Sequence, residues 1–252
     1  MTRSLDDLLA EAQSAPIRGW DFSWLDGRAS EERPSWGYSR LLGRRLAQAA
    51  AALDVQTGGG ELLAGLDRLP PLMVATEGWL PNLEIARRRL GPRGAFVVGA
   101  HDDRPGLPLR SELFDLVVSR HPVTTWWDEI ARVLRPGGAF LSQQVGPGSV
   151  KELAEALRGP LPPSTARSPE RAVAAARDAG LRVVDLREQS LRTVFYDVGA
   201  VVYFLRLVVW IVPDFSVERH RRQLESLHEV MEAEGSFVTY ARRFLIEARK
   251  PT

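Results

Sequence analysis

The sequence has no cysteine, only two lysines and only four histidines among its 252 residues. Without cysteine, disulfides, a catalytic thiolate and cysteine-ligated zinc are excluded, and no metal site is predicted. Long apolar runs are also missing, and the first residues lack the cationic start and apolar core of a signal peptide. The formal net charge of +1 argues against broad capture of nucleic acid, although it leaves a local basic face open. We therefore expect a cytoplasmic protein with no membrane partner.

The rest of the composition is typical of a globular chain, with 44% hydrophobic and 26% charged residues. A chain of this length buries roughly three quarters of its surface on folding, so a full hydrophobic core is feasible. Residues 1–38 are rich in aromatic and charged side chains and predict an N-terminal segment or lid. Residues 39–252 predict the main domain, with a helical insertion at about 197–234.

From residue 39 onward, short apolar segments alternate with segments of helical periodicity, whereas no strong periodicity precedes that residue. Strands are predicted over 53–55, 72–76, 95–100, 114–119, 139–144, 181–187 and 244–248, with a turn at 135–138. Helices are predicted over 39–52, 61–66, 81–90, 126–134, 150–158, 169–179 and 217–234. This order predicts an α/β fold: a Rossmann-like, doubly wound, mostly parallel seven-stranded sheet with helices on both faces, plus N-terminal and C-terminal lid elements.

Ligands of such sheets bind beyond the carboxyl ends of the strands, and polar signals follow four successive predicted strands there. The loop Asp54–Gly60 contains glycines that allow close backbone approach and positive φ. Glu77 ends the next strand, where a carboxylate can accept hydrogen bonds from a ribose diol. Asp102 and Asp103 follow the third strand, where a carboxylate can accept from an adenine amino group. Taken singly, a structural turn and solvated loop carboxylates are the alternatives.

As an ordered set, these signals resemble the class I S-adenosylmethionine-dependent methyltransferases of the type 11 group. The family pattern is an acidic-x-Gly-x-Gly-x-Gly loop, an acidic residue ending the second strand, an Asp followed by Leu-Pro, a Phe-Asp-Leu-Val strand and a Leu-Arg/Lys-Pro-Gly-Gly turn. The matching segments are Asp54–Gly60, Glu77, Asp103 with Leu107-Pro108, Phe114–Val117 and Leu134–Gly138. Three further phrases resemble a bacterial subgroup of these enzymes: Trp20–Ser23, Ala75–Gly78 and Ser142–Gly146.

The resemblance implies methyl transfer with S-adenosyl-L-methionine as cofactor. In this family the loop glycines pack against the methionine part, Asp54 would help to hold its amino group, and Glu77 would bind the ribose. The paired aspartates would bind the adenine. The implied cofactor-binding residues are Asp54, Gln56, Gly58, Gly60, Glu77, Gly78, Asp102 and Asp103.

Gln56 departs from the family pattern, because it replaces the first glycine of the loop. A side chain at this position is expected to crowd the cofactor and weaken its binding, or else to add a hydrogen bond. Loss of cofactor binding is the third alternative, and it would leave a catalytically degenerate binding module.

The methyl acceptor would lie at the loop after the fourth strand, which faces the sulfonium methyl in this family. Methyl transfer depends mostly on proximity and orientation, with a base only where the nucleophile carries a proton. His121 is the candidate general base or substrate anchor, and Arg120 a candidate anchor for a carboxylate or phosphate. Their structural alternatives are helix capping and a salt bridge. Further candidate substrate contacts are Trp36, Tyr38 and Gln144, the two aromatic residues as part of a lid.

These patterns favour a small-molecule acceptor, since the neutral net charge does not indicate nucleic acid. An RNA-base methyltransferase is the alternative enzyme. The apolar stretch 198–212 predicts a buried helix or lid element, with a homodimer interface and a hydrophobic substrate pocket or membrane contact as the other interpretations.

Overall fold

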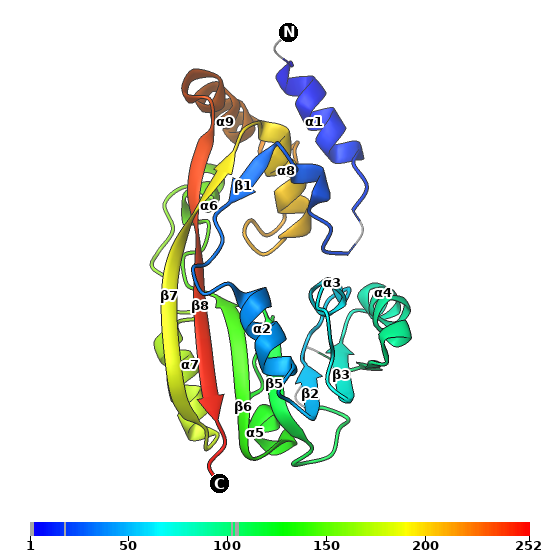
Figure 1. The fold of residues 1–252 in the computed structure, drawn as a ribbon. Coiled ribbons are helices and arrows are strands. Elements are labelled where there is room, and N and C mark those ends of the chain that lie inside the picture. Colours follow the sequence, from blue (N-terminus) through cyan, green and yellow to red (C-terminus); the bar gives the residue numbers. More distant parts are fainter. Residues whose placement is uncertain (1–2, 18, 102, 104–105) are drawn as a thin grey trace. The chain divides into compact units, whose positions relative to one another are not determined.

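The structure is a computed structural model that describes residues 3–17, 19–101, 103 and 106–252. The chain forms two compact units. Unit 1 contains residues up to 33 together with 147–165 and 190–242, and unit 2 contains 34–146, 166–189 and 243–252. The two strands β7 (Arg182–Phe195) and β8 (Phe237–Arg249) each continue from one unit into the other (Figure 1).

The sheet of unit 2 is doubly wound, as the alternation of strands and helices predicts. Its strands are β2 (Ala51–Asp54), β3 (Leu72–Glu77), β4 (Phe96–Gly99), β5 (Phe114–Arg120) and β6 (Leu134–Val145). β2 pairs in parallel with both β3 and β5, β3 pairs in parallel with β4, and β5 with β6. The end of β8 runs antiparallel to β6. The chain therefore leaves β2 toward one side for β3 and β4 and toward the other for β5 and β6.

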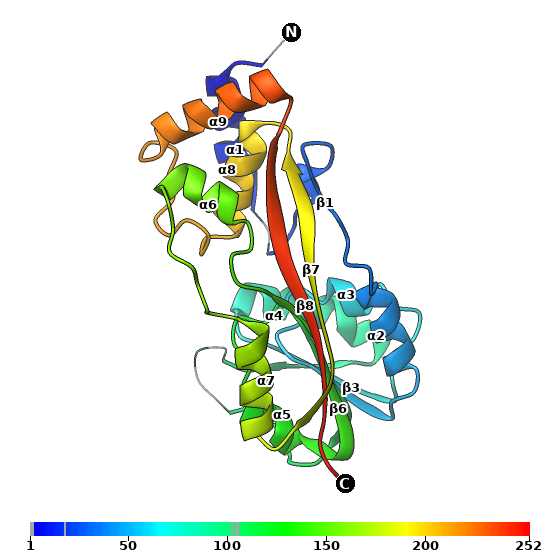
Figure 2. The same ribbon diagram turned by 90° about the vertical axis from the view of Figure 1, so that its left-hand side faces the viewer.

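Helices cover both faces of this sheet because successive strand residues point to opposite sides. Leu116 and Val118 of β5 pack in the cluster that holds α2 (Tyr38–Leu46), α3 (Glu61–Ala64) and α4 (Leu80–Leu90). Val117, between them, packs in the cluster that holds α5 (Trp127–Val133) and α7 (Pro169–Asp178). Figure 2 shows α5 and α7 on one side of the strands and α2 on the other.

Unit 1 is built around α8 (Val198–Leu207), most of whose residues are buried. Its other elements are α1 (Leu5–Ser14), β1 (Ala29–Glu31), α6 (Lys151–Arg158) and α9 (Arg221–Glu234). Arg28 stacks over Trp24, with its guanidinium carbon 3.8 Å from the ring centroid, and donates to the Asp197 carboxylate that caps α8. Of the predicted stretch 198–212, residues 198–207 form a buried helix, and Val209 and Trp210 beyond it are exposed. Among the described residues, no helix has the length and apolarity needed to cross a bilayer.

Three sequence-based expectations need correction. The sheet contains eight strands among the described residues, one more than predicted, because the short edge strand β1 pairs with the end of β7. The predicted turn at 135–138 lies within β6, where Gly137 has a φ of 76° and β5 and β6 shift register. Helix α1 was missed, although the Ser4 side chain accepts from the Asp7 N–H in the manner of an N-cap. The division at residue 38, the insertion at about 197–234 and the lid elements stay predictions.

The close approach of α1 and α8 yields a stability prediction. A Cβ added at Gly199 would lie 2.9 Å from the Leu8 carbonyl oxygen and 2.7 Å from an Arg28 nitrogen. We expect Gly199→Ala to lower the free energy of unfolding by about 1–3 kcal/mol, because the backbone of α1 must shift. Gly91→Ala is the matched control, since its φ is −54° and nothing lies within 4 Å of its added Cβ. Equal chemical-denaturation midpoints for the two variants would contradict this packing.

Candidate cofactor and acceptor site

The glycine loop after β2 is fastened to the strands on either side of it. The Val55 N–H donates to the Val118 carbonyl of β5 at 2.9 Å, and the Thr57 N–H donates to the Thr76 carbonyl of β3 at 2.8 Å. Gly60 has a φ of 77°, and an added Cβ there would lie 2.8 Å from the Leu90 side chain. Glycine is therefore required at Gly60 both by the backbone conformation and by the approach of α4.

Glu77 lies at the carboxyl end of β3, with its side chain turned to the glycine loop. Its two carboxylate oxygens accept from the N–H of Gly58 at 2.8 Å and from the N–H of Trp79 at 2.9 Å. Burial raises the pKa of Glu77, while the backbone N–H groups of Trp79, Gly58 and Gly78 oppose the rise. A carboxylate offers about four acceptor positions, so at least one remains beyond these three N–H groups.

Asp54 ends β2 and is buried. Burial raises its pKa to about 7, against the hydroxyl of Thr57, and the charge of Glu77 adds to the rise. The phenol of Tyr38 also has a raised pKa, first because it is buried and then because Asp54 lies near. Asp54 and Glu77 thus bring two carboxyl groups to adjacent strand ends, as the sequence predicts.

The predicted adenine contacts are only partly described. Asp102 lies outside the described residues. Asp103 has a side chain that is 84% exposed, and its carboxylate lies 3.9 Å from His101. The role of this pair stays a prediction.

Gln56 adopts a φ of 59°, which is the region that the family's glycine occupies without strain. Its side chain reaches across to the loop after β5. The Oε1 atom accepts from the Val123 N–H at 2.6 Å, and the Nε2 atom donates to the Thr124 carbonyl at 2.8 Å. Both polar atoms of the amide are therefore engaged by the protein itself.

His121 follows β5 and is held by a chain of hydrogen bonds. The Trp36 indole N–H donates to Oε1 of Gln143 at 2.8 Å, which directs the Gln143 amide nitrogen at Nε2 of His121, 2.9 Å away. Because this nitrogen can only donate, Nε2 of His121 accepts and the ring proton lies on Nδ1. Burial, followed by the charges of Arg243 and Arg120, lowers the pKa of His121 well below its ordinary value. The imidazole is therefore neutral at physiological pH.

The remaining predicted residues support or border this loop. Tyr38 is buried and donates from its hydroxyl to the Ser119 carbonyl at 2.8 Å. Trp36 is also buried, so neither aromatic side chain is disposed as a movable cover. Gln144 donates to the Thr125 hydroxyl at 3.3 Å, and the Arg120 side chain is exposed. Their substrate roles stay predictions.

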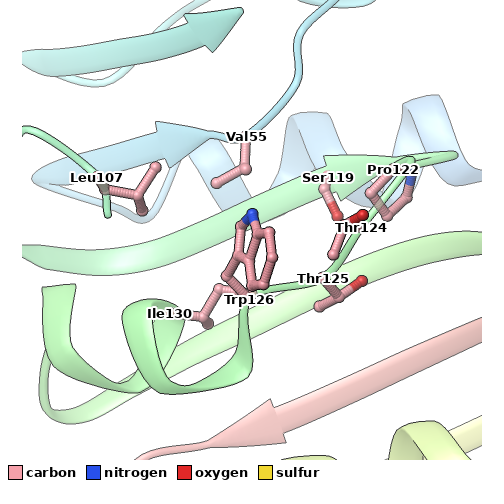
Figure 3. Close-up of a pocket in the computed structure, with 8 residues that line it drawn as sticks. All are labelled: Val55, Leu107, Ser119, Pro122, Thr124, Thr125, Trp126 and Ile130. Carbon is pink, nitrogen blue, oxygen red and sulfur yellow. The ribbon is translucent and has the colours of Figure 1, made fainter. Parts of the chain in front are cut away.

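A small cavity of about 10 Å³ lies between the carboxyl ends of β2 and β5 (Figure 3). Trp126 is one of the residues that line it, and its indole nitrogen points toward Val55. This nitrogen is buried and has no hydrogen-bond partner among the described residues. Sequence reasoning did not single out Trp126, which belongs to no recognisable motif, and of the neighbouring amides Gln143 and Gln144 it chose Gln144. The lining residues are Val55, Leu107, Ser119, Pro122, Thr124, Thr125, Trp126 and Ile130.

The donor set fits S-adenosyl-L-methionine at its nucleoside end. Glu77 keeps acceptor capacity for a ribose hydroxyl, and the nearby residue Trp79 is 51% exposed. Gly58 and Gly60 leave the loop without side chains that would block a ligand's approach. The buried carboxyl of Asp54 suits an ammonium group, which would restore its ionised form.

Solved structures share this fold at low sequence identity. A protein from Bacillus halodurans C-125 named as a candidate methyltransferase has a TM-score of 0.60 and 17% identity, covering 85% of this chain and 99% of its own. A functionally unknown protein from Deinococcus radiodurans R1 has a TM-score of 0.59 and 16% identity, covering 88% and 90%. A candidate sarcosine dimethylglycine methyltransferase from Galdieria sulphuraria has a TM-score of 0.51 and 17% identity, covering 86% and 84%. No functionally curated protein matches the sequence.

The fold and the site define a class. A doubly wound sheet with a glycine loop after one strand and a buried carboxylate ending the next is the arrangement found in class I S-adenosylmethionine-dependent methyltransferases. The particular family match is to the methyltransferase domain, over residues 53–142, which include the glycine loop, Glu77 and β5. S-adenosyl-L-methionine is the cofactor that this domain match implies.

The burial of Asp54 yields a pH prediction. Its folded-state pKa of about 7 lies above the ordinary value of 3.8, so the folded protein binds the proton more tightly than the unfolded chain. The contribution of Asp54 to stability therefore falls as pH rises from about 4 to about 7. We expect Asp54→Asn to remove this loss, so the unfolding temperature of the variant should gain on the wild type between pH 5 and pH 8. Parallel pH profiles would show that Asp54 is ionised in the folded protein throughout.

Proposed function

We propose that the enzyme transfers the methyl group of S-adenosyl-L-methionine to a small-molecule acceptor held at the loop after β5. The observation that carries this proposal is the uncharged, hydrogen-bonded pair of His121 and Gln143 at that loop. The His121 ring is half-buried and bonds to the buried amide of Gln143, and Arg120 and Arg243 are the two cations that act on the ring. Recognition of a nucleic acid backbone depends on a more extended cluster of cations. The net charge of +1 agrees with this choice.

The residues that would bind the cofactor lie at two adjacent strand ends, those of β2 and β3. Glu77 at β3 would accept from the ribose hydroxyls, with Gly78 beside it, and the glycine loop after β2 would admit the methionine end. Asp54 would face the amino group. When bound, the cofactor supplies an electrophilic methyl group on sulfur, and the protein contributes chiefly orientation and the exclusion of water.

His121 is better suited to anchoring an acceptor than to removing a proton from it. The Gln143 amide nitrogen lies 2.9 Å from Nε2 of the ring and occupies its lone pair. The proton on Nδ1 leaves His121 a donor, which can bind an oxygen or nitrogen atom of the acceptor. Arg120, exposed next to it, adds one cation that suits an acidic group on a small molecule.

Replacement of Glu77 tests the cofactor site. We expect Glu77→Gln to weaken the binding of S-adenosylhomocysteine by about tenfold or more, because hydrogen bonds to a charged acceptor are replaced by weaker ones. Isothermal titration calorimetry measures the affinity. Glu84→Gln is the matched control, since Glu84 is exposed on α4. Unchanged affinity in a folded Glu77→Gln protein would remove Glu77 from the ribose role.

The acceptor class is tested by following the release of S-adenosylhomocysteine from S-adenosyl-L-methionine. We expect release to be stimulated by a pool of small polar metabolites and not by total RNA, because the loop offers neutral hydrogen-bonding groups. Heat-inactivated enzyme serves as the control. Stimulation by RNA alone would replace this proposal with RNA-base methylation.

A further inference from the structure

Gln56 stands where a glycine is expected, and its backbone stays in the conformation that favours glycine. A non-glycine residue at positive φ is strained, because its Cβ approaches the following carbonyl oxygen. The strain is compatible with stability only if contacts elsewhere offset it. The two hydrogen bonds to Val123 and Thr124, at 2.6 and 2.8 Å, are the contacts that this side chain makes.

The two bonds have an unusual geometry, because one side chain satisfies a donor and an acceptor on consecutive residues of a distant loop. The Val123 side chain is 57% exposed, yet its N–H is paired with the Gln56 amide oxygen. A carboxylate could accept from Val123 but could not donate to the Thr124 carbonyl. Only an amide of this length makes both bonds.

Val123 and Thr124, which bond to Gln56, lie just before Trp126 in the chain. Trp126 is at the topological switch point of the sheet. Trp126 lines the cavity between Val55 and Ser119, where the strand order reverses direction (Figure 3). Ligands of open α/β sheets bind at this point. The position of Trp126 there therefore depends on how the preceding residues 122–125 are held.

We propose that Gln56 is a positioning residue: its amide latches the loop after β5 to the glycine loop and thereby places residues 122–126 against the methionine end of the cofactor. The latch takes the place of the family's glycine without contacting the cofactor itself. Residues 122–126, placed in this way, would lie between the reactive end of the cofactor and the acceptor. This inference rests on the proposed function, in which the glycine loop binds S-adenosyl-L-methionine.

The first test needs no ligand. Amide hydrogen exchange, followed by NMR on the full chain, reports the Val123 N–H directly. We expect Gln56→Leu, which keeps the bulk but removes both bonds, to speed exchange at Val123 at least tenfold. Gln56→Glu should keep Val123 protected, because its carboxylate still accepts. Fast exchange of Val123 in the wild type, or equal protection in Gln56→Leu, overturns the latch.

The second test separates positioning from a general structural effect by comparing two ligands. Adenosine contains the part that Glu77 would hold, and S-adenosylhomocysteine adds the amino-acid end. We expect Gln56→Leu to weaken S-adenosylhomocysteine about tenfold, in line with two lost hydrogen bonds, while adenosine affinity changes less than twofold. Gln56→Gly should show the same selective loss although it relieves the backbone strain.

The relative affinities for the two ligands decide between a positioning role and a structural role of Gln56. Equal weakening of both ligands indicates a merely structural role and overturns the proposal, as does tighter binding of S-adenosylhomocysteine, which would mean that the latch closes the site. A wild-type protein that binds neither ligand overturns the proposed function and the cofactor-directed part of this inference. Slow Val123 exchange in that protein would still establish the latch itself.

Discussion

The carboxyl edge of the sheet in unit 2 depends on side chains that satisfy backbone groups of neighbouring loops. Glu77 accepts from the N–H groups of Gly58 and Trp79, and Gln56 bonds to the backbone of Val123 and Thr124. A buried loop backbone without such partners would cost a lost hydrogen bond at each group. The glycine loop, the end of β3 and the loop after β5 are thereby joined into one hydrogen-bonded edge.

This edge holds carboxyl groups whose burial lowers the stability of the folded protein. Burial raises the pKa values of Asp54 and Glu77, and the charge of Glu77 adds to the rise at Asp54. On the other side of the site, burial and two arginines keep His121 neutral. Carboxyl groups with raised pKa values and histidines with lowered ones are both common in functional sites. There, a bound ligand replaces the water that burial removed. The proposed cofactor, which carries an ammonium and a sulfonium group, would relieve the acidic side.

Prediction from the sequence succeeded where the signal is local or periodic. The alternation of Leu116, Val117 and Val118 between two helical layers follows from the period of a strand, and the glycine loop was placed correctly after β2. It failed at α1, although Leu5, Leu8, Leu9 and Ala12 follow helical spacing and Ser4 supplies an N-cap. Residues 135–138, predicted as a turn, lie within β6 as an irregularity: β5 pairs with Leu134 and next with Ala139, and Gly137 between them keeps a positive φ of 76°.

The sequence by itself determined the class of the fold, the order of the strands' terminal signals and the positions of Glu77 and the glycine loop, because these depend on residue periodicity and on backbone conformations that few residues adopt. Only the tertiary structure decided what Gln56, Trp36 and Gln143 do. Gln56 bonds to residues 67 and 68 positions away, and Trp36 bonds to a residue 107 positions away. Such contacts depend on where separate elements meet in space, and no local pattern specifies the direction of a side chain across that distance.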